Sequence, residues 1–196
     1  MSNLLAAQVA RAAPAWHVSA WLNTNGPLTL ADLRGRVVVM HAFQMLCPGC
    51  VSHGIPQAQR IAALFRPEQV CVVGFHTVFE HHDAMGPVSL AAFLYEYRVR
   101  FPVAIDEAGV GAPIPKTMEA YQMRGTPTLI LIDKQGRLRM NAFGRPDDMA
   151  VGAAIAALVG EPHDVAADAV GRGGVQGAAA ADADPSAACD DDGCSI

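Results

Sequence analysis

The chain has 196 residues, and its 14 basic and 19 acidic side chains give a formal net charge of −5. Seven Asp and one Arg fall after residue 162, so the acidity belongs to that end, and the residues before it sum to +1. The sequence has no cluster of Lys and Arg and no apolar run near the roughly 20 residues that span a bilayer, so we expect neither nucleic-acid binding nor membrane insertion.

Residues 1–13 are an Ala-rich lead-in, which we expect to form a short N-terminal arm. No basic residue precedes Arg11, and Gln8 interrupts the apolar stretch, so this segment is unlike a secretion signal. We therefore expect a cytoplasmic location, where cysteines stay reduced unless redox chemistry is their function.

Residues 14–161 alternate between strand-like and helix-like patterns, which predicts an α/β domain. The predicted strands span 36–43, 70–79, 102–105, 128–133 and 137–143. The predicted helices span 48–65, 89–97 and 147–159, with Ser89 as the expected N-cap of the second. We expect a central mixed β-sheet with helices on both faces, in which the last two strands form a hairpin. Residues 162–196 are rich in Ala, Asp and Gly without an aromatic residue, and we expect them to be a disordered, flexible tail.

Cys47-Pro48-Gly49-Cys50 lies where the first predicted strand ends and the first predicted helix begins. Unpaired backbone N–H groups at the first turn of a helix stabilise an anion, so we expect Cys47 to be a thiolate nucleophile. The spacing brings the second sulfur within disulfide distance, and Cys50, deeper in the helix, is the expected resolving thiol. Zinc binding needs four ligands, usually as two such pairs, so a redox role is favoured over zinc binding and over inert packing.

Residues 14–161 resemble the thioredoxin superfamily, specifically its TlpA-like, redoxin-type thiol–disulfide oxidoreductases. Two stretches carry the resemblance, Leu30-Ala31-Asp32-Leu33-Arg34-Gly35-Arg36-Val37-Val38-Val39 before the CxxC motif and Tyr121-Gln122-Met123-Arg124-Gly125-Thr126-Pro127-Thr128-Leu129-Ile130-Leu131-Ile132-Asp133 after it. The resemblance implies a thioredoxin fold, to which this chain adds an N-terminal extension and a disordered C-terminal tail.

The resemblance also implies roles for individual residues. Cys47 matches the nucleophile and Cys50 the resolving cysteine, while Pro127 matches the cis-proline that faces the disulfide. The backbone of Thr126 is expected to pair with an extended substrate segment. The further residues expected to contact substrate are Phe43, Pro48 and Gly49.

The chain departs from the family pattern at two positions near the motif. His41 lies six residues before Cys47, where thioredoxins carry a buried acid that moves protons for the resolving cysteine. A neutral His41 could accept the proton of Cys50, and the alternative is a hydrogen-bonded core histidine. Pro56 stands one position later than the helix proline of the family, so we expect the first helix to bend differently.

Two further chemistries were weighed against disulfide exchange. A peroxiredoxin resembles a pattern with Thr three residues and Pro seven residues before its reactive cysteine, where this chain has Gln44 and Met40, so peroxide reduction is disfavoured. His76, His81, His82 and Asp83 could suggest a metal site, but adjacent histidines point in different directions on most backbones. We expect no metal and no cofactor beyond a Cys47–Cys50 disulfide, and a loop after the second predicted strand that lies near it.

Cys189 and Cys194 flank three aspartates and a glycine near the end of the sequence. They are either an incidental pair or a redox relay that exchanges disulfides with Cys47 and Cys50 across a flexible tether.

The sequence therefore predicts a thiol–disulfide oxidoreductase that exchanges disulfides with protein or low-molecular-weight thiol substrates and uses a separate electron donor or acceptor. The alternative from another class is a redox sensor or adaptor whose CxxC motif switches partner binding without turnover.

Overall fold

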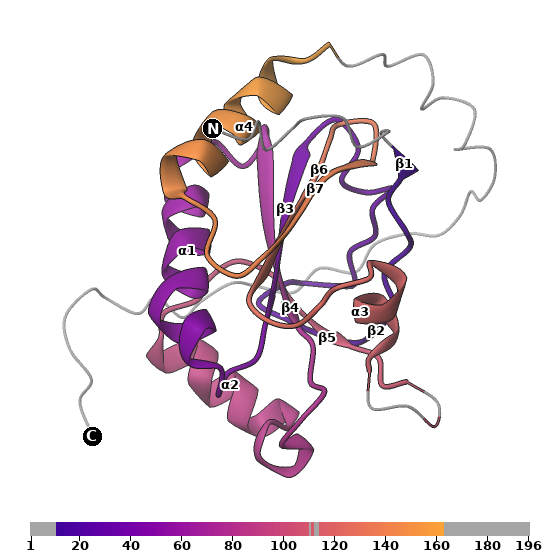
Figure 1. Ribbon diagram of the computed structural model, residues 1–196, viewed down its shortest axis with the longest axis vertical. Helices are drawn as coiled ribbons and strands as arrows, with labels where there is room; N and C mark the ends of the chain where they lie inside the picture. Colours follow the sequence, from indigo (N-terminus) through magenta and orange to yellow (C-terminus); the bar gives the residue numbers. More distant parts are fainter. Residues whose placement is uncertain (1–10, 110, 112–113, 163–196) are drawn as a thin grey trace, which may run out of the picture.

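The computed structural model describes residues 11–109, 111 and 114–162 (Figure 1). These residues contain a seven-stranded sheet in the order β1-β7-β6-β3-β4-β5-β2. The strands are β1 (Arg11–Ala12), β2 (Val18–Leu22), β3 (Val37–Phe43), β4 (Val70–His76), β5 (Val103–Asp106), β6 (Thr128–Ile132) and β7 (Arg137–Phe143). The helices are a π-helical turn η1 (Cys50–Gly54), α1 (Ile55–Leu64), a 3-10 turn η2 (His82–Ala84), α2 (Pro87–Glu96), α3 (Lys116–Ala120) and α4 (Asp148–Gly160).

The central strand β3 is buried along its whole length because both faces of the sheet are covered. It runs parallel to β4 and antiparallel to β6, and β5 continues the sheet parallel to β4. Its odd-numbered residues, such as Val39 and Phe43, join a core with residues of α1, α2 and α4. Its even-numbered residues, such as Met40, join a second core with residues of α3. Figure 1 shows these three helices on one face and α3 on the other, which confirms the predicted mixed sheet flanked by helices.

The second long helix begins earlier than predicted. Ser89 was expected to be its N-cap, but α2 starts at Pro87, and Gly86 occupies the cap position. Proline suits the first position of a helix because its φ is already helical and it lacks an N–H group that would go unpaired there. Ser89 is therefore an exposed residue of the first turn.

Three short elements were absent from the prediction. β1 pairs two residues of the expected N-terminal arm with β7, β2 adds an antiparallel strand beside β5, and α3 has five residues. Residues 1–10 and the tail from 163, with Cys189 and Cys194, lie outside the described residues. Within the described part of the chain, no helix is long and apolar enough to cross a membrane.

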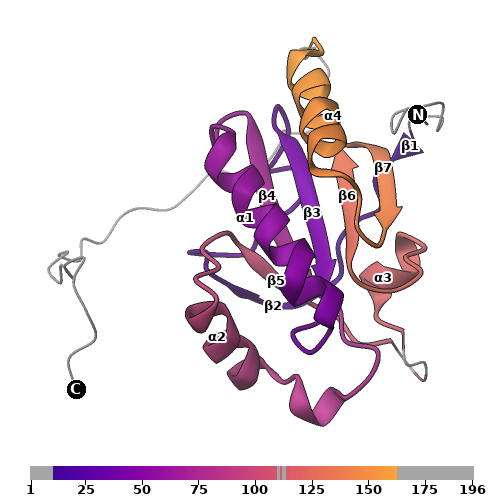
Figure 2. The same cartoon turned by 60° about the vertical axis from the view of Figure 1, so that its left-hand side comes forward.

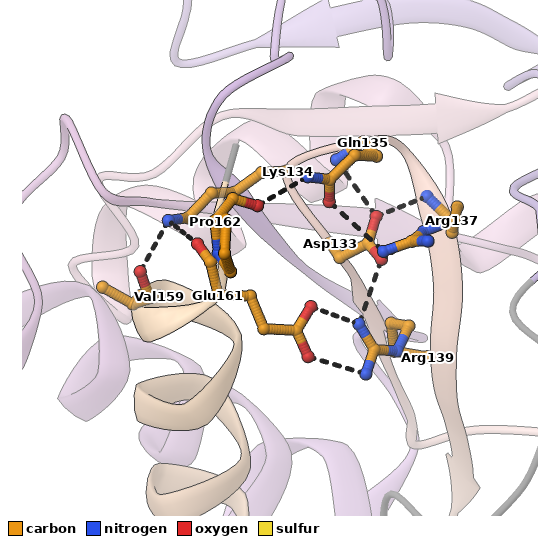
Figure 3. Close-up of polar contacts among 8 residues, drawn as sticks. All are labelled: Asp133, Lys134, Gln135, Arg137, Arg139, Val159, Glu161 and Pro162. Carbon is orange, nitrogen blue, oxygen red and sulfur yellow. Dashed lines mark hydrogen bonds and ion pairs between the residues drawn. The ribbon is translucent and has the colours of Figure 1, made fainter. Parts of the chain in front are cut away.

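A polar network fastens the end of α4 to the β6–β7 hairpin (Figure 3). Lys134 Nζ donates to two backbone carbonyls at the end of α4, at 2.6 and 2.8 Å. Arg139 binds both carboxylate oxygens of Glu161, at 2.6 and 2.8 Å, and also donates to the buried carboxylate of Asp133 at 3.1 Å. Arg137 donates to the same Asp133 oxygen at 2.7 Å. This network fixes the end of α4 against the β6–β7 hairpin.

Candidate active site

Cys47 lies just after the C-terminal end of β3, immediately before the chain becomes helical. Its carbonyl accepts hydrogen bonds from the backbone N–H groups of Cys50 and Val51, at 3.0 and 3.1 Å. The N–H of Cys50 also faces the Cys47 sulfur, 3.4 Å away. Because Cys47 is partly exposed and a backbone donor faces its sulfur, it is the thiol of the pair that a substrate can reach.

Cys50 is fully buried, and both cysteines carry free thiols. Burial, and after it the hydrogen bond with the Cys47 side chain, raise the pKa of the Cys50 thiol to about 12. At neutral pH Cys50 therefore keeps its proton and cannot be the first attacker. It needs a base before its sulfur can act.

The loop before β6 faces the two cysteines. The Thr126–Pro127 peptide bond is cis, in agreement with the prediction. The Cys47 thiol donates to the Thr126 carbonyl at 3.5 Å. A Cβ atom on Gly49 would lie 3.3 Å from the ring of Pro127, so the CxxC turn and the proline loop pack closely against each other.

His41 is buried in the centre of β3, beneath the helical segment that carries Cys50. A Cβ atom on Gly54 would lie 2.3 Å from His41 Cε1 and 2.5 Å from Nε2, so the imidazole occupies the space left by this glycine. Neither ring nitrogen has a hydrogen-bond partner among the described residues. Burial, and to a smaller degree the charge of His53, lower the pKa of His41 to about 4. The imidazole of His41 is therefore neutral at physiological pH, and among the described residues it lacks the hydrogen bond of the core histidine considered as the alternative.

A groove of about 550 Å³ opens beside Cys47. Residues from four segments line it: 44 and 46–48 after β3, 79–81 and 84–85 after β4, 125–126 at the proline loop, and Phe143 at the end of β7. Leu46 is 55% exposed and Phe143 47% exposed, so much of the lining is apolar surface open to solvent. The loop after β4 was expected near the disulfide, and its position along the groove confirms this.

Only some of the predicted substrate-contact residues line the groove. Pro48 and Thr126 line the groove together with Cys47. Phe43 was expected to touch substrate, but it is only 1% exposed and belongs to the core, because its side chain points into the face covered by α1. Gly49 packs behind the groove, against Pro127.

The histidines at the end of β4 and in the loop after it have different surroundings. His76 is buried beside Phe43, at a ring-centroid distance of 5.4 Å, whereas His81 and His82 are exposed. Within the described ranges, no group of three or more His, Cys, Asp or Glu side chains could hold a metal ion.

Sequence reasoning missed several residues of the site. Gln44 is buried and bonded to the loop that carries Glu80, and Phe143 closes the far wall of the groove. Gly54, opposite His41, carried a weak signal, since a glycine inside a predicted helix costs stability and usually has a packing reason.

Comparison with known proteins agrees with this geometry. A sequence model of the AhpC/TSA family matches residues 9–141. The crystal structure of the thioredoxin-like superfamily protein SPOA0173 is 56% identical, covers 79% of this chain and 100% of its own, and superposes with a TM-score of 0.77. A thiol-disulfide isomerase from Corynebacterium glutamicum is 48% identical over 76% of this chain and 98% of its own, with a TM-score of 0.73.

The curated relatives that this chain matches are much longer proteins, and the similarity covers only a part of each. Protein DipZ of Mycobacterium tuberculosis is 29% identical over 132 residues, which are 66% of this chain. The match spans only 18% of the length of that relative.

Proposed function

Because this chain belongs to the AhpC/TSA family of thioredoxin-like proteins, we propose that it is a thiol–disulfide oxidoreductase in which Cys47 attacks and Cys50 resolves. The observation that carries this proposal is the asymmetry of the pair. Cys47 is open to the groove and faces a backbone donor, whereas Cys50 is buried with its pKa raised to about 12.

The reaction moves two electrons and two protons from the protein to the substrate. The Cys47 thiolate attacks one sulfur of a substrate disulfide, the substrate S–S bond breaks, and the first substrate thiol leaves. Cys50 then gives up its proton and attacks the Cys47 sulfur, which releases the second substrate thiol and leaves a Cys47–Cys50 disulfide. A dithiol donor restores the reduced protein, and the same steps in reverse oxidise a substrate dithiol.

We assign the removal of the Cys50 proton to His41. It is neutral at working pH, it packs against Gly54, which closes the helical turn that begins at Cys50, and its nitrogens have no partner among the described residues. Replacement of His41 by Ala should slow the second step and leave the attack of Cys47 on a disulfide unchanged. Quenched-flow kinetics that resolve the two steps would contradict this role if both rates were unaffected.

Redox titration tests the main proposal. The full chain is equilibrated in a glutathione series, free thiols are trapped, and each disulfide is located by mass spectrometry. We expect a two-electron Cys47–Cys50 couple with a single midpoint, and a Cys50→Ser variant that accumulates a mixed disulfide at Cys47. A Cys71→Ser variant serves as the control and should keep the wild-type midpoint.

Two further assays, of partner binding and of peroxide consumption, separate the other candidate functions. Oxidation-dependent partner binding without turnover would indicate a redox sensor or adaptor. Rapid consumption of hydrogen peroxide by the reduced protein would indicate a thiol peroxidase. If Cys47 and Cys50 never pair, the oxidoreductase proposal is wrong.

We further propose that Cys189 and Cys194 exchange disulfides with the Cys47–Cys50 pair. The described chain ends at residue 162, 27 residues before Cys189. A flexible chain of that length has a root-mean-square span of about 30 Å, comparable with a small domain. Truncation after Pro162, which keeps the contacts of Glu161, should slow turnover with some reductants; equal turnover with every reductant would exclude the relay.

We also propose a cytoplasmic location for this chain. Fractionation of cells that express the full chain tests it, and recovery outside the cytoplasm would contradict it.

A further inference from the structure

The groove beside Cys47 carries one fixed charge. Among its described lining residues, Glu80 is the only carboxylate, and none is Lys or Arg. The rest of the surface is largely apolar, with Leu46, Met85 and Phe143 among its members. A charge framed by apolar walls acts more strongly on a ligand than the same charge on an open surface.

Glu80 is held in place relative to the reactive sulfur. Buried Gln44 donates through Nε2 to Glu80 Oε1 at 3.3 Å and accepts the backbone N–H of Phe79 at 3.4 Å. The backbone carbonyl of Gln44 accepts the backbone N–H of Cys47 at 3.1 Å. One side chain therefore connects the segment before the nucleophile to the loop that carries the carboxylate.

No cation neutralises Glu80 in the described part of the chain. The salt bridges there involve other acids. Arg124 lies near the lining residue Phe143, but its guanidinium sits over the ring of Phe143, 5.3 Å from the centroid, and it does not line the groove. His81 lines the groove beside Glu80 and is its nearest titratable neighbour along the chain.

We propose that this groove selects extended polypeptide segments in which the attacked cysteine is flanked by apolar residues and by a Lys or Arg that reaches Glu80. This inference rests on the proposed oxidoreductase function and names its substrate class. Apolar flanking residues bury against the groove walls, and the cation forms a charge-assisted hydrogen bond with a carboxylate that Gln44 already holds in position. An acidic residue at the same place would face Glu80 without a counter-charge.

Three peptides that differ in one residue test the proposal. Each has the form acetyl-Ala-Phe-Cys-X-Ala-amide, with X as Lys, Gln or Glu, and carries a mixed disulfide with 2-thiopyridine, a neutral leaving group. The Cys47 thiolate attacks the peptide sulfur, the bond to 2-thiopyridine breaks, and pyridine-2-thione is released while a Cys47–peptide disulfide forms. Thione absorbance reports this step without any added reductant. The rate of a Cys47→Ser variant, which comes from the other cysteines, is subtracted.

We expect the Lys peptide to react about tenfold faster than the Glu peptide at low ionic strength, with the Gln peptide between them. Added salt should reduce the preference. Glu80→Gln keeps the shape of the side chain and should remove the preference. Asp83→Asn removes the same charge from an exposed residue outside the groove and should retain it.

The failure of this inference is distinguishable from failure of the proposed function. Equal rates for the three peptides, or a preference that survives in Glu80→Gln, would overturn the role of Glu80 while Cys47 remained reactive. If none of the peptides reacts faster with the wild type than with Cys47→Ser, the nucleophile itself has been assigned wrongly.

Discussion

At the level of single residues, His41 and Gly54 are packed so closely that a larger residue at position 54 would overlap the imidazole. The imidazole fills the space beside a helix that would otherwise hold a Cβ atom, so the histidine requires the glycine. This contact lets a bulky base lie beneath the helical segment that carries the dithiol.

Gly54→Ala should therefore destabilise the protein by about 2 kcal/mol, because the new methyl group overlaps His41. In a His41→Ala background the same substitution should cost much less, since the ring is gone and only the Pro127 Cβ, 3.2 Å from the added atom, remains close. Gly152→Ala in α4 is the matched control; nothing lies within 4 Å of its added Cβ, and it should gain up to about 1 kcal/mol. Urea unfolding measures all four variants, and equal costs for Gly54→Ala in both backgrounds would refute the contact.

His41 should also govern acid stability. Its pKa is lowered from 6.5 to about 4 in the folded protein, mainly by burial, so between these values the unfolded chain binds a proton that the folded chain does not. The stabilisation is present above pH 6.5 and is lost as the pH falls toward 4. We expect His41→Asn to retain about 2 kcal/mol more of its neutral-pH stability at pH 4.5 than the wild type does.

The buried His76, whose pKa is also lowered to about 4 by burial, should leave a residual acid dependence in that variant. Exposed His82→Asn is the control and should follow the wild-type profile in urea unfolding. An unchanged profile in His41→Asn would show that its protonation does not limit acid stability.

At the level of elements, the π-helical turn η1 explains the displaced proline of the first helix. The N–H of Ile55 donates to the carbonyl of Cys50, five residues earlier, so the turn holds one residue more than an α-helical turn. Pro56 thus stands one position later than in the family while still occupying the start of α1. The extra residue is absorbed between Cys50 and α1, and the buried face of α1 remains in contact with the sheet.

The network at the end of α4 gives a prediction for an element far from the groove. Asp133 is buried and accepts from two arginines and from the backbone N–H groups of Gln135 and Arg137. Asp133→Ala should cost about 3 kcal/mol, because it leaves the hairpin donors and the arginines without their acceptor. The rate of disulfide exchange at 25 °C should stay at the wild-type value.

Arg60→Gln provides the contrast, since it breaks the exposed pair with Asp148 and should change stability by about 0.5 kcal/mol or less. Thermal unfolding and an exchange assay on the same samples would check both. A slower exchange in Asp133→Ala would mean that the network acts on the site as well as on stability.

Elements differ in how well the sequence predicts them. The strands β3, β4 and β6 and the CxxC junction are encoded locally, by apolar runs and a motif at a strand end. The strand β2 has a mixed burial pattern and depends on pairing with β5, more than 80 residues away, so no local signal marks it. The groove was beyond local reasoning for the same reason, since its walls come from four segments that meet only in the folded sheet.

At the level of the whole molecule, the cysteines and the tail begin at opposite ends. Cys47 follows the C-terminal end of β3, whereas Lys134, which holds the end of α4, accepts through its carbonyl the N–H of Gly35 before β3 begins. Figure 2 shows the end of α4 and the first turn of the α1 segment at opposite poles. The strand β3, whose seven residues extend over about 23 Å, runs between these two regions.

The tail and the groove also carry charges of the same sign. The segment around Cys189 and Cys194 contains three aspartates, and the groove contains Glu80. Exchange between the tail and Cys47 should therefore accelerate as salt is added, the reverse of the trend expected for a basic peptide. Mass spectrometry of trapped tail–Cys47 disulfides at two ionic strengths measures the rate of this exchange. A rate that falls as salt is added would contradict repulsion between the two sets of carboxylates.

The position of the end of α4, away from Cys47, has a practical consequence for work on surfaces. A bead or electrode coupled directly at Pro162, in a chain truncated there, would hold the domain near the end of α4 and leave the groove beside Cys47 facing the solution. Immobilised in this orientation, the protein should react with large folded substrates as readily as with short peptides.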